Sequence, residues 1–326
     1  METVVLQPTK KNIALCAEKL KAGELVAFPT ETVYALGALA TDPAAVRRVF
    51  DVKKRPLDRA LIVAVSDKAE IATVVRRVPE KAAALIDAFM PGALTLLFDR
   101  AACIPDAVTA GGGSVAVRIP DNDIALALIR AAGGPVVVPS ANTSEMPSPT
   151  LAEHVLGDLN GKIEYILDGG ASEIGIESTI VDARCEPPVI LRVGGVTKEQ
   201  IESVIGPVTL ARERAKTDPF KPMAEVMFSA FYPGMESNIC TRYDELTEQG
   251  RSVAIICLDG NREKYGDRTV FTVGDDYKQY AHNLFATLRR ADSEHYEIVI
   301  AEGVDTAGLG LSLVERLVKL SGGMII

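Results

Sequence analysis

Four basic side chains lie close together in this sequence: Lys53, Lys54, Arg55 and Arg59. They stand just before an apolar run, residues 60–65, which is typical of a buried strand. The formal net charge of the chain is -9 at pH 7, so a local group of cations beside a strand indicates an anion-binding site. Taken alone, the cluster is also typical of a solvated turn whose basic side chains cover apolar surface. Other polar residues are needed to decide between the two interpretations.

Small hydroxyl and amide side chains follow two further apolar runs. Ser140 and Asn142 come directly after residues 135–138, and Thr32 comes shortly after residues 24–28. In α/β proteins, ligand contacts are commonly placed where a buried strand ends. Threonine is also favoured inside strands, so for Thr32 the structural and the ligand-binding interpretations carry equal weight.

A guanidinium interrupts one apolar run. Arg118 lies within residues 115–119, and Arg192 similarly ends a later apolar run. An arginine in such a place either faces solvent or holds a carboxylate or phosphate with two parallel hydrogen bonds, and we favour the second for Arg118. The glycines at 111–113, followed by Ser114, would let backbone amides approach a phosphate, although they match no established nucleotide-binding motif.

Length and composition limit the classes of function that the protein can have. A chain of 326 residues with 48% hydrophobic and 24% charged residues predicts an ordered protein of two domains. Asp and Glu number 44 against 35 Lys and Arg, which argues against extensive, sequence-independent nucleic-acid binding. The five cysteines are scattered along the sequence and form no C-x-x-C pair, so neither a disulfide framework nor a zinc site is indicated. Without a signal-like segment or a long apolar run, we expect a soluble cytoplasmic protein and no membrane contact.

We expect helices and strands to alternate along the chain and so to position the polar and basic residues described above. Capping residues followed by helical periodicity, and short apolar runs between them, predict an α/β fold over the first part of the chain. Expected helices begin after Thr9, Asp42 and Asp67, and expected strands are residues 24–28, 60–65, 94–98, 115–119 and 135–138.

The alternation breaks after residue 206. Prolines punctuate residues 207–250, a stretch too long for an ordinary connection, which predicts a linker with a possible role as a lid. Strands at 252–257, 269–273 and 296–301 and helices at 276–290 and 309–320 then predict a small α/β unit. We therefore expect domains at residues 1–206 and 251–326.

Six short motifs occur in a fixed order: Pro29-Thr-Glu-Thr-Val-Tyr34, Lys53-x-Arg55-Pro56, Ser140-Ala-Asn142, Ser148-Pro-Thr150, Glu177-Ser-Thr179 and Leu191-Arg192. Each is short, but the ordered set is specific, and it resembles the YrdC/Sua5 family of L-threonylcarbamoyladenylate synthases. The resemblance covers residues 8–205, and the later part is similar to the Sua5 C-terminal domain.

The resemblance implies a YrdC-like catalytic domain with a twisted mixed sheet and a large basic cavity, followed by a small Rossmann-like α/β domain. It also implies a nucleotidyltransferase that joins L-threonine, bicarbonate and ATP into threonylcarbamoyl-AMP and releases pyrophosphate. The product would supply the threonylcarbamoyl group of adenosine 37 in tRNAs, through a downstream transferase. Binding of tRNA itself would be weak.

Roles for individual residues follow from the resemblance. Attack by a carbamate oxygen on the α-phosphorus of ATP builds negative charge, so fixed cations and Mg²⁺ suit the reaction, and no covalent nucleophile is needed. Mg²⁺ would be held through ATP rather than by direct protein ligands. The implied sets are Lys53 and Arg55 for catalysis; Arg55, Arg59, Ser114, Ser140, Asn142, Ser148 and Arg192 for ATP; and Thr32, Arg118 and Ser178 for L-threonine, Arg118 pairing with its carboxylate.

Two departures from the family pattern keep alternatives open. Ala64 stands where relatives commonly carry a histidine, and the linker segment has Tyr232 but no histidine, so Tyr232 is the candidate for a closing role. A carbamoyl-adenylate enzyme acting on another acceptor therefore remains an alternative. A non-catalytic RNA-binding module is a second, which the acidic balance disfavours.

Overall fold

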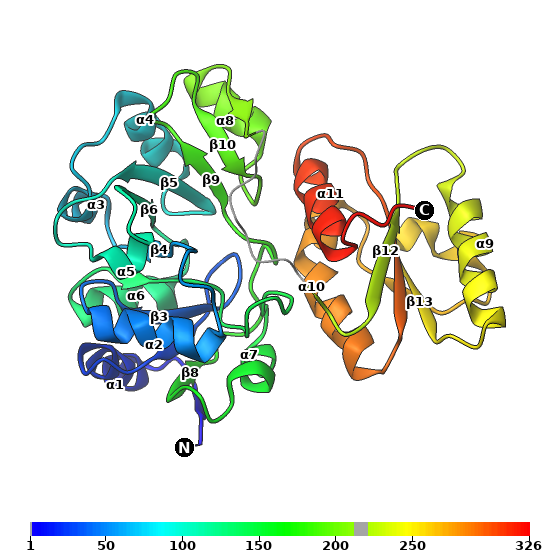
Figure 1. Ribbon diagram of the computed structural model, residues 1–326, viewed down its shortest axis with the longest axis horizontal. Coiled ribbons are helices and arrows are strands. Elements are labelled where there is room, and N and C mark those ends of the chain that lie inside the picture. The colour runs from blue at the N-terminus through cyan, green and yellow to red at the C-terminus, as the bar shows by residue number, and fades with distance from the viewer. Residues whose placement is uncertain (1, 212–220) are drawn as a thin grey trace. The chain divides into compact units, whose positions relative to one another are not determined.

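The computed structural model describes residues 2–211 and 221–326 (Figure 1). Contacts divide the chain into two compact units, and each has its own sheet. The first unit comprises Met1–Ser144 and Ser148–Thr217, and the second comprises Glu145–Pro147 and Asp218–Ile326. Within the described ranges no helix is long and apolar enough to cross a membrane.

The first unit is built on an 11-stranded mixed sheet, which confirms the expected fold class. Parallel pairs such as β4 with β6 alternate with antiparallel pairs such as β5 with β6. In spatial order the strands are β1 (Val4–Leu6), β8 (Tyr165–Leu167), β2 (Val26–Phe28), β3 (Ala35–Leu39), β7 (Val136–Val137), β4 (Ile62–Ala64), β6 (Ser114–Arg118), β5 (Leu94–Asp99), β9 (Thr179–Asp182), β10 (Val189–Arg192) and β11 (Thr209–Leu210).

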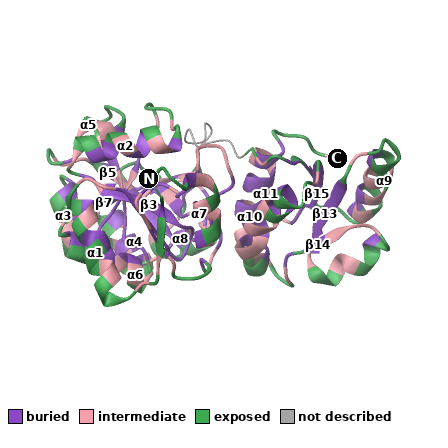
Figure 2. Cartoon of the chain, turned by 90° about the horizontal axis from the view of Figure 1, so that it is seen from below, coloured by how far each residue is buried: buried purple, intermediate pink, exposed green. Residues whose placement is uncertain are grey.

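Helices cover this sheet through apolar faces. Cys16 and Leu20 of α1 and Leu128 and Ile129 of α6 share one buried cluster with Phe28 of β2, and burial of each such side chain contributes about 1.5–3 kcal/mol. Figure 2 shows the buried strands between helices whose outer faces are exposed. The helices are α1 (Lys10–Lys21), α2 (Pro43–Lys53), α3 (Lys68–Val74), α4 (Glu80–Phe89), α5 (Asp106–Thr109), α6 (Asp123–Ala132), α7 (Ala152–Leu159) and α8 (Lys198–Ile205).

Local sequence signals explain where α2 begins and ends. The Asp42 carboxylate accepts hydrogen bonds from the amides of Ala44 and Ala45, and Pro43 occupies the first helical position. Lys54 ends the helix in the left-handed conformation, with φ 53. The turn that follows carries the basic cluster out of the helix and into β4.

Strand register divides the site residues between two ends of the sheet. β4 lies between β6, which runs parallel to it, and β7, which runs antiparallel. Ala64 is opposite Arg118 at one end, whereas Ser114 starts β6 at the other end, about 13 Å away along the strand. Because the basic turn enters β4 from the end where Ser114 lies, Arg55 and Arg118 approach the sheet from different ends.

The second unit is a small, fully parallel α/β layer structure. Its strand order is β12 (Glu225–Ser229), β15 (Ile298–Glu302), β13 (Val253–Cys257) and β14 (Val270–Thr272). Helices α10 (Tyr277–Ser293) and α11 (Leu309–Leu320) lie on one side of these strands, and α9 (Met235–Glu248) lies on the other (Figure 1). A 3-10 helix, η1 (Asp259–Tyr265), joins β13 to β14. The arrangement is the Rossmann-like unit that the sequence predicted.

The expected linker differs from the structure. Residues 207–250 contain β12, which pairs with β15 along its whole length, and α9, which packs on β13. Most of this stretch is therefore part of the second unit, while residues 212–220 lie outside the described part. Tyr232 follows β12, is 36% exposed and contacts Asn238 through its hydroxyl. The structure thus places Tyr232 within the second unit.

Candidate active site

Lys53 organises the loop that carries Ser140 and Asn142. Its ammonium donates to the carbonyl oxygens of Ser140 and Asn142 at 2.5 and 2.6 Å and to the Asn142 amide oxygen at 3.2 Å. The Lys53 carbonyl in turn accepts the amide of Ser144 at 2.8 Å. Lys53 is only 1% exposed. In the described residues its ammonium is directed at the loop.

Burial shapes the electrostatics of these cations. Burial lowers the pKa of Lys53 well below the usual 10.5. The charge of Arg55 is the second cause and acts in the same direction, whereas the charge of Asp158 raises the pKa. Burial is also the largest cause that lowers the pKa of Arg55, to about 10. The charge of Arg59 acts in the same direction, and the charge of Asp58 raises this pKa by a smaller amount. Cations held this close together repel one another, so an anion that binds between them relieves an existing cost.

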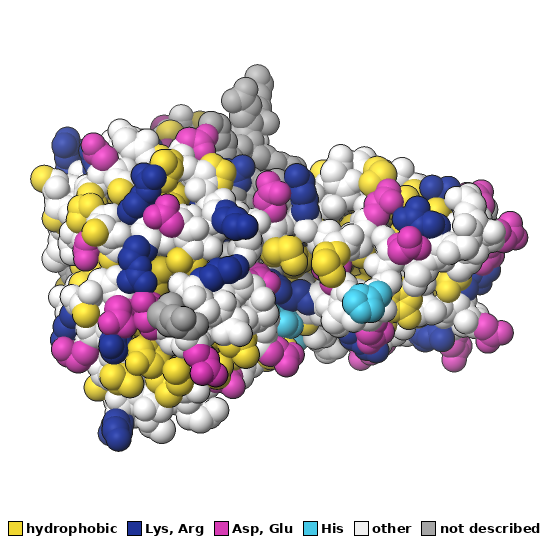
Figure 3. All heavy atoms as spheres, turned by 60° about the horizontal axis from the view of Figure 1, so that its bottom comes forward, with side chains coloured by type: hydrophobic (Ala, Val, Ile, Leu, Met, Phe, Trp, Pro, Cys, Tyr) yellow, Lys and Arg dark blue, Asp and Glu magenta, His cyan; other side chains and the backbone are white. Residues whose placement is uncertain are grey.

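Arg55 and Arg59 lie on the same turn. The Arg55 guanidinium donates to the carbonyl oxygens of Arg59 at 3.3 Å and Ala60 at 3.2 Å, so the turn is braced by the side chain that it carries. Ser114 starts β6 at this same end of the sheet. Several Lys and Arg side chains gather on one face of the first unit (Figure 3). The turn that carries Arg55 and Arg59 therefore enters the sheet at the end where Ser114 lies.

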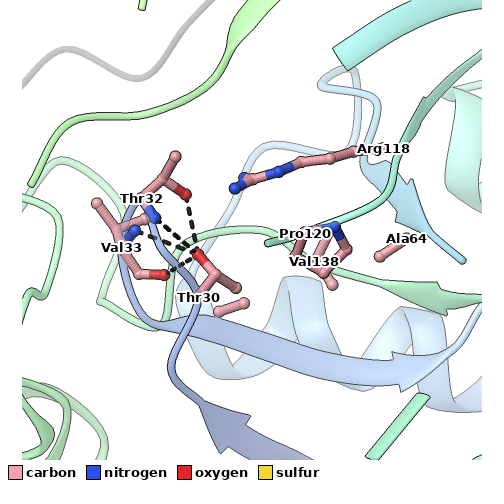
Figure 4. A pocket seen from close by; sticks show the side chains of 8 residues that line it. Thr30, Thr32, Val33, Ala64, Arg118, Pro120 and Val138 are labelled. Carbon is pink, nitrogen blue, oxygen red and sulfur yellow. Dashed lines mark hydrogen bonds between the residues drawn. The ribbon is translucent and has the colours of Figure 1, made fainter. Parts of the chain in front are cut away.

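A small pocket lies at the other end of β4, where Arg118 projects towards two threonine hydroxyls (Figure 4). Its empty volume is ≈ 260 Å³, which includes space open to solvent. The hydroxyls of Thr30 and Thr32 contact each other at 2.9 Å. The pocket is lined by Thr30, Thr32, Val33, Ala35, Ala64, Arg118, Pro120 and Val138.

Arg118 has a buried carboxylate partner that the sequence analysis did not assign. Its Nη2 lies 2.7 Å from Oε1 of Glu31, and the two side chains are 8% and 5% exposed. Nε of Arg118 donates to the carbonyl oxygen of Gly92 at 3.3 Å. Arg118 lines the pocket, whereas Glu31, its partner, does not.

Ser178 and Arg192 are in direct contact. Nε and Nη2 of Arg192 donate to the Ser178 carbonyl oxygen at 3.0 and 2.8 Å, and Nη2 also reaches the Ser178 hydroxyl at 3.1 Å. The same hydroxyl contacts that of Thr95 at 2.8 Å. A residue expected to bind threonine and one expected to bind ATP are therefore joined by hydrogen bonds.

Ser148 has an acidic neighbour. Its hydroxyl donates to Oε1 of Glu177 at 2.7 Å, and it is 1% exposed. In the described residues no cluster of three or more His, Cys, Asp or Glu side chains could hold a metal by itself. Hydroxyl, amide and carboxylate oxygens from Ser148, Asn142 and Glu177 are nonetheless the hard donors that suit Mg²⁺ carried on phosphates.

Three residues at the site were missed: Glu31 and Thr95, which are buried, and Glu177, which is half-buried. Glu31 and Glu177 lie inside the recognised motifs, so a charged residue next to a hydroxyl in an apolar setting was the available signal. Thr95 gave no signal, because a threonine in a strand is ordinary and its partner Ser178 is distant in sequence.

Two family models match the chain. One, described as "Telomere recombination" and named for Sua5, YciO and YrdC, matches residues 18–194. The other, described as "Threonylcarbamoyl-AMP synthase, C-terminal domain", matches residues 196–322. Together they span both units.

Relatives of similar length match in sequence and in structure. The threonylcarbamoyl-AMP synthases of Pyrococcus abyssi and Bacillus subtilis are each 40% identical, over 96% and 98% of this chain and 95% and 96% of their own lengths. A crystal structure of P. abyssi Sua5 in complex with L-threonine superposes with a TM-score of 0.92 at 38% identity, covering 100% of this chain and 98% of that one.

Proposed function

Because this chain belongs to the YrdC/Sua5 family, we propose that it makes L-threonylcarbamoyl-AMP from L-threonine, bicarbonate and ATP, with release of pyrophosphate. The observation that carries the proposal is a small pocket at Arg118 and a basic turn at the other end of β4, in a chain 40% identical to named synthases over nearly its full length. The product would serve the modification of tRNA adenosine 37 through a downstream transferase.

The reaction needs electrostatic help rather than a covalent nucleophile. The amine of threonine condenses with bicarbonate to give a carbamate and water, and a carbamate oxygen then forms a bond to the α-phosphorus while the bond to the pyrophosphate oxygen breaks. Negative charge spreads over the phosphate oxygens in the transition state, and fixed cations stabilise it. Mg²⁺, bound with ATP, would neutralise phosphate charge there.

We assign the phosphates to the basic end of the site. Arg55 and Arg59 would contact the triphosphate, and Arg192 would reach it while holding Ser178. Lys53 would act indirectly, since its ammonium holds the Ser140 to Asn142 loop in place. The remaining contacts to the nucleotide or its magnesium would come from Ser114, Ser140, Asn142 and Ser148.

We assign L-threonine to the pocket. Arg118 would pair with its carboxylate, and Thr32, which also lines the pocket, would offer a hydroxyl. Ser178 is assigned to threonine by the resemblance alone, since it does not line the pocket and its hydroxyl contacts Thr95 and Arg192. The solved P. abyssi relative bound to L-threonine, 38% identical, supports this choice of amino acid. Ala64 lines the pocket with a single methyl group, so side-chain selection would rest on the other lining residues. We also propose a cytoplasmic location, where five free cysteines stay reduced.

A direct assay tests the function. The purified chain is incubated with ATP, Mg²⁺ and bicarbonate, with each of several amino acids, and pyrophosphate and the adenylate are followed. We expect pyrophosphate release that depends on threonine. Release that is the same without threonine, or with alanine in its place, would refute the proposal.

Arg55→Ala tests the phosphate assignment. We expect a loss of about 100-fold in kcat for pyrophosphate release, because one positioned cation of the transition state is removed. The matched control is Arg47→Ala, an exposed arginine on α2 whose side chain is 58% exposed. If Arg55→Ala keeps wild-type turnover while its Tm is unchanged, Arg55 does not serve the phosphates.

A further inference from the structure

We propose that Glu31 determines the charge selectivity of the Arg118 pocket, so that the pocket favours a zwitterionic α-amino acid over a simple carboxylate anion. This inference rests on the proposed function, because it concerns how the same pocket recognises its amino acid. Glu31 acts through Arg118 and is a positioning and specificity residue rather than a catalytic one.

The first argument is the contact itself. Nη2 of Arg118 lies 2.7 Å from Oε1 of Glu31, and both side chains are more than nine-tenths buried. In the described part of the chain, neither carboxylate oxygen of Glu31 accepts an aligned hydrogen bond. The charge of Glu31 is therefore balanced by Arg118 alone among these residues, and not by a structural network.

The second argument is the rigidity of the segment that carries Glu31. The Glu31 carbonyl accepts the amide of Ile174 at 2.7 Å, and the Thr32 carbonyl accepts that of Gly175 at 3.0 Å. Side-chain hydroxyls of Thr30 and Thr32 are fixed to each other. Because these bonds hold the backbone on the C-terminal side of its Cα, we expect Glu31 to stay beside Arg118 when the pocket fills.

The third argument is charge. Arg118 is the sole charged side chain among the eight lining residues, which without Glu31 would give a small buried cavity a net positive charge. Such a cavity would draw in any carboxylate, bicarbonate included, because Coulomb interactions strengthen away from water. With Glu31 bound to Arg118 the net charge of the pair is zero, which weakens the attraction for a simple anion. An α-amino acid carries its carboxylate and its ammonium on the same carbon and is itself neutral overall, so it loses less of its attraction to the pocket than an anion does.

The test compares two ligands in two proteins. Dissociation constants of L-threonine and of 3-hydroxybutyrate, which is threonine without its ammonium, are measured by calorimetry for the full-length wild type and for Glu31→Gln. Glutamine keeps the shape of the side chain and removes its charge. We expect the threonine Kd to rise about tenfold, while 3-hydroxybutyrate binds equally well or more tightly. Glu80→Gln, which removes the same charge from the surface start of α4, should change neither constant.

A merely structural role for Glu31 predicts something else, namely an equal change for both ligands, and that result would overturn the inference while leaving the proposed function intact. A second measurement uses the wild-type protein alone. 3-Hydroxybutyrate and threonine amide each carry one net charge, and both should bind at least tenfold more weakly than threonine. Equal binding of 3-hydroxybutyrate and threonine by the wild type would also overturn it. Failure of the wild type to bind threonine at all would remove the proposed function as well.

Discussion

At the scale of single residues, the basic cluster separates into different roles. Lys53 is buried and holds a loop, Arg55 and Arg59 form a turn at the basic end, and Lys54 ends a helix in the left-handed conformation and is exposed. Residue type alone could not separate them, because four neighbouring cations look alike in a sequence. The burial of each side chain depends on the face of α2 from which it extends. Asp42, the N-cap, fixes the residue at which α2 begins.

Lys53 should make stability depend on pH. Its pKa is lowered in the folded protein, so between that value and 10.5 the unfolded state binds more protons, and the free energy of unfolding rises with pH. Methionine at position 53 binds no proton in either state, so the Lys53→Met variant lacks this pH dependence. We expect the stability difference between wild type and Lys53→Met to increase from pH 7 to pH 10, by at most about 1.4 kcal/mol per pH unit. Chemical denaturation across this range measures it.

The control for that series is Lys54→Met, which removes a neighbouring exposed lysine. A stability difference for Lys53→Met that falls as the pH rises would contradict the lowered pKa. Loss of the three hydrogen bonds that Lys53 donates makes Lys53→Met less stable than wild type where the Lys53 amine is neutral.

At the scale of elements, the end of β10 is pressed against the segment that carries Glu177 and Ser178. A Cβ at Gly194 would lie 2.2 Å from the Glu177 carbonyl oxygen and 2.4 Å from the Ser178 carbonyl carbon. Both contacts are with backbone, which cannot turn aside as a side chain can. The close approach is what lets Arg192, two residues earlier, reach Ser178.

Gly194→Ala should therefore damage the site as well as the fold. We expect a destabilisation of about 1–3 kcal/mol and a loss of threonine-dependent pyrophosphate release, because residues 177–179 must shift. Thermal unfolding and the pyrophosphate assay measure the two effects. Gly157→Ala is the control, since nothing lies within 4 Å of its Cβ, and alanine in α7 should add about 0.5–1 kcal/mol. A Gly194→Ala variant that behaves like Gly157→Ala would disprove the argument.

Elements with strong local signals were predicted well. α11 occupies the predicted residues 309–320, and α10, predicted over residues 276–290, spans Tyr277–Ser293. Residues 207–250 were expected to form a linker, whereas they contain β12 and α9. Pro222 and Pro233 in fact lie outside β12 and α9, at the ends of those elements. Composition over a window cannot tell prolines that flank a strand from prolines that interrupt it.

The site was predictable by residue type but not by pairing. Motifs carried the resemblance and named the residues, whereas partners such as Glu31 with Arg118 are joined only by the register of distant strands. No local rule relates residue 31 to residue 118, so this part of the site required the structure.

At the scale of the whole molecule, each unit has its own core. One buried cluster joins α1, α6 and their strands, and another joins α9 to β13 and β15. The apolar residues of each cluster come from one unit only. Each unit therefore buries enough apolar surface within itself to fold without the other's core.

A chain ending at Ala211 should fold. We expect it to unfold cooperatively on heating and to retain a near-ultraviolet circular dichroism signal, since it keeps all 11 strands of the first sheet. Differential scanning calorimetry of this chain beside the full-length protein measures the transition. A broad transition without a heat-absorption peak would mean that the first unit depends on the second for its stability.

The strand order of the first sheet has a consequence for synthesis. β8 inserts between β1 and β2, and β7 inserts between β3 and β4, although both are made well after their neighbours. A nascent chain that has emerged only as far as Gly134 can pair β2 with β3 and β4 with β6, but it lacks β8 beside β2 and β7 between β3 and β4. Non-local pairing of this kind slows folding and leaves strand edges open to wrong partners. In the second unit β15 likewise inserts between β12 and β13, but all four strands lie within residues 225–302, so the wait for the last strand is shorter.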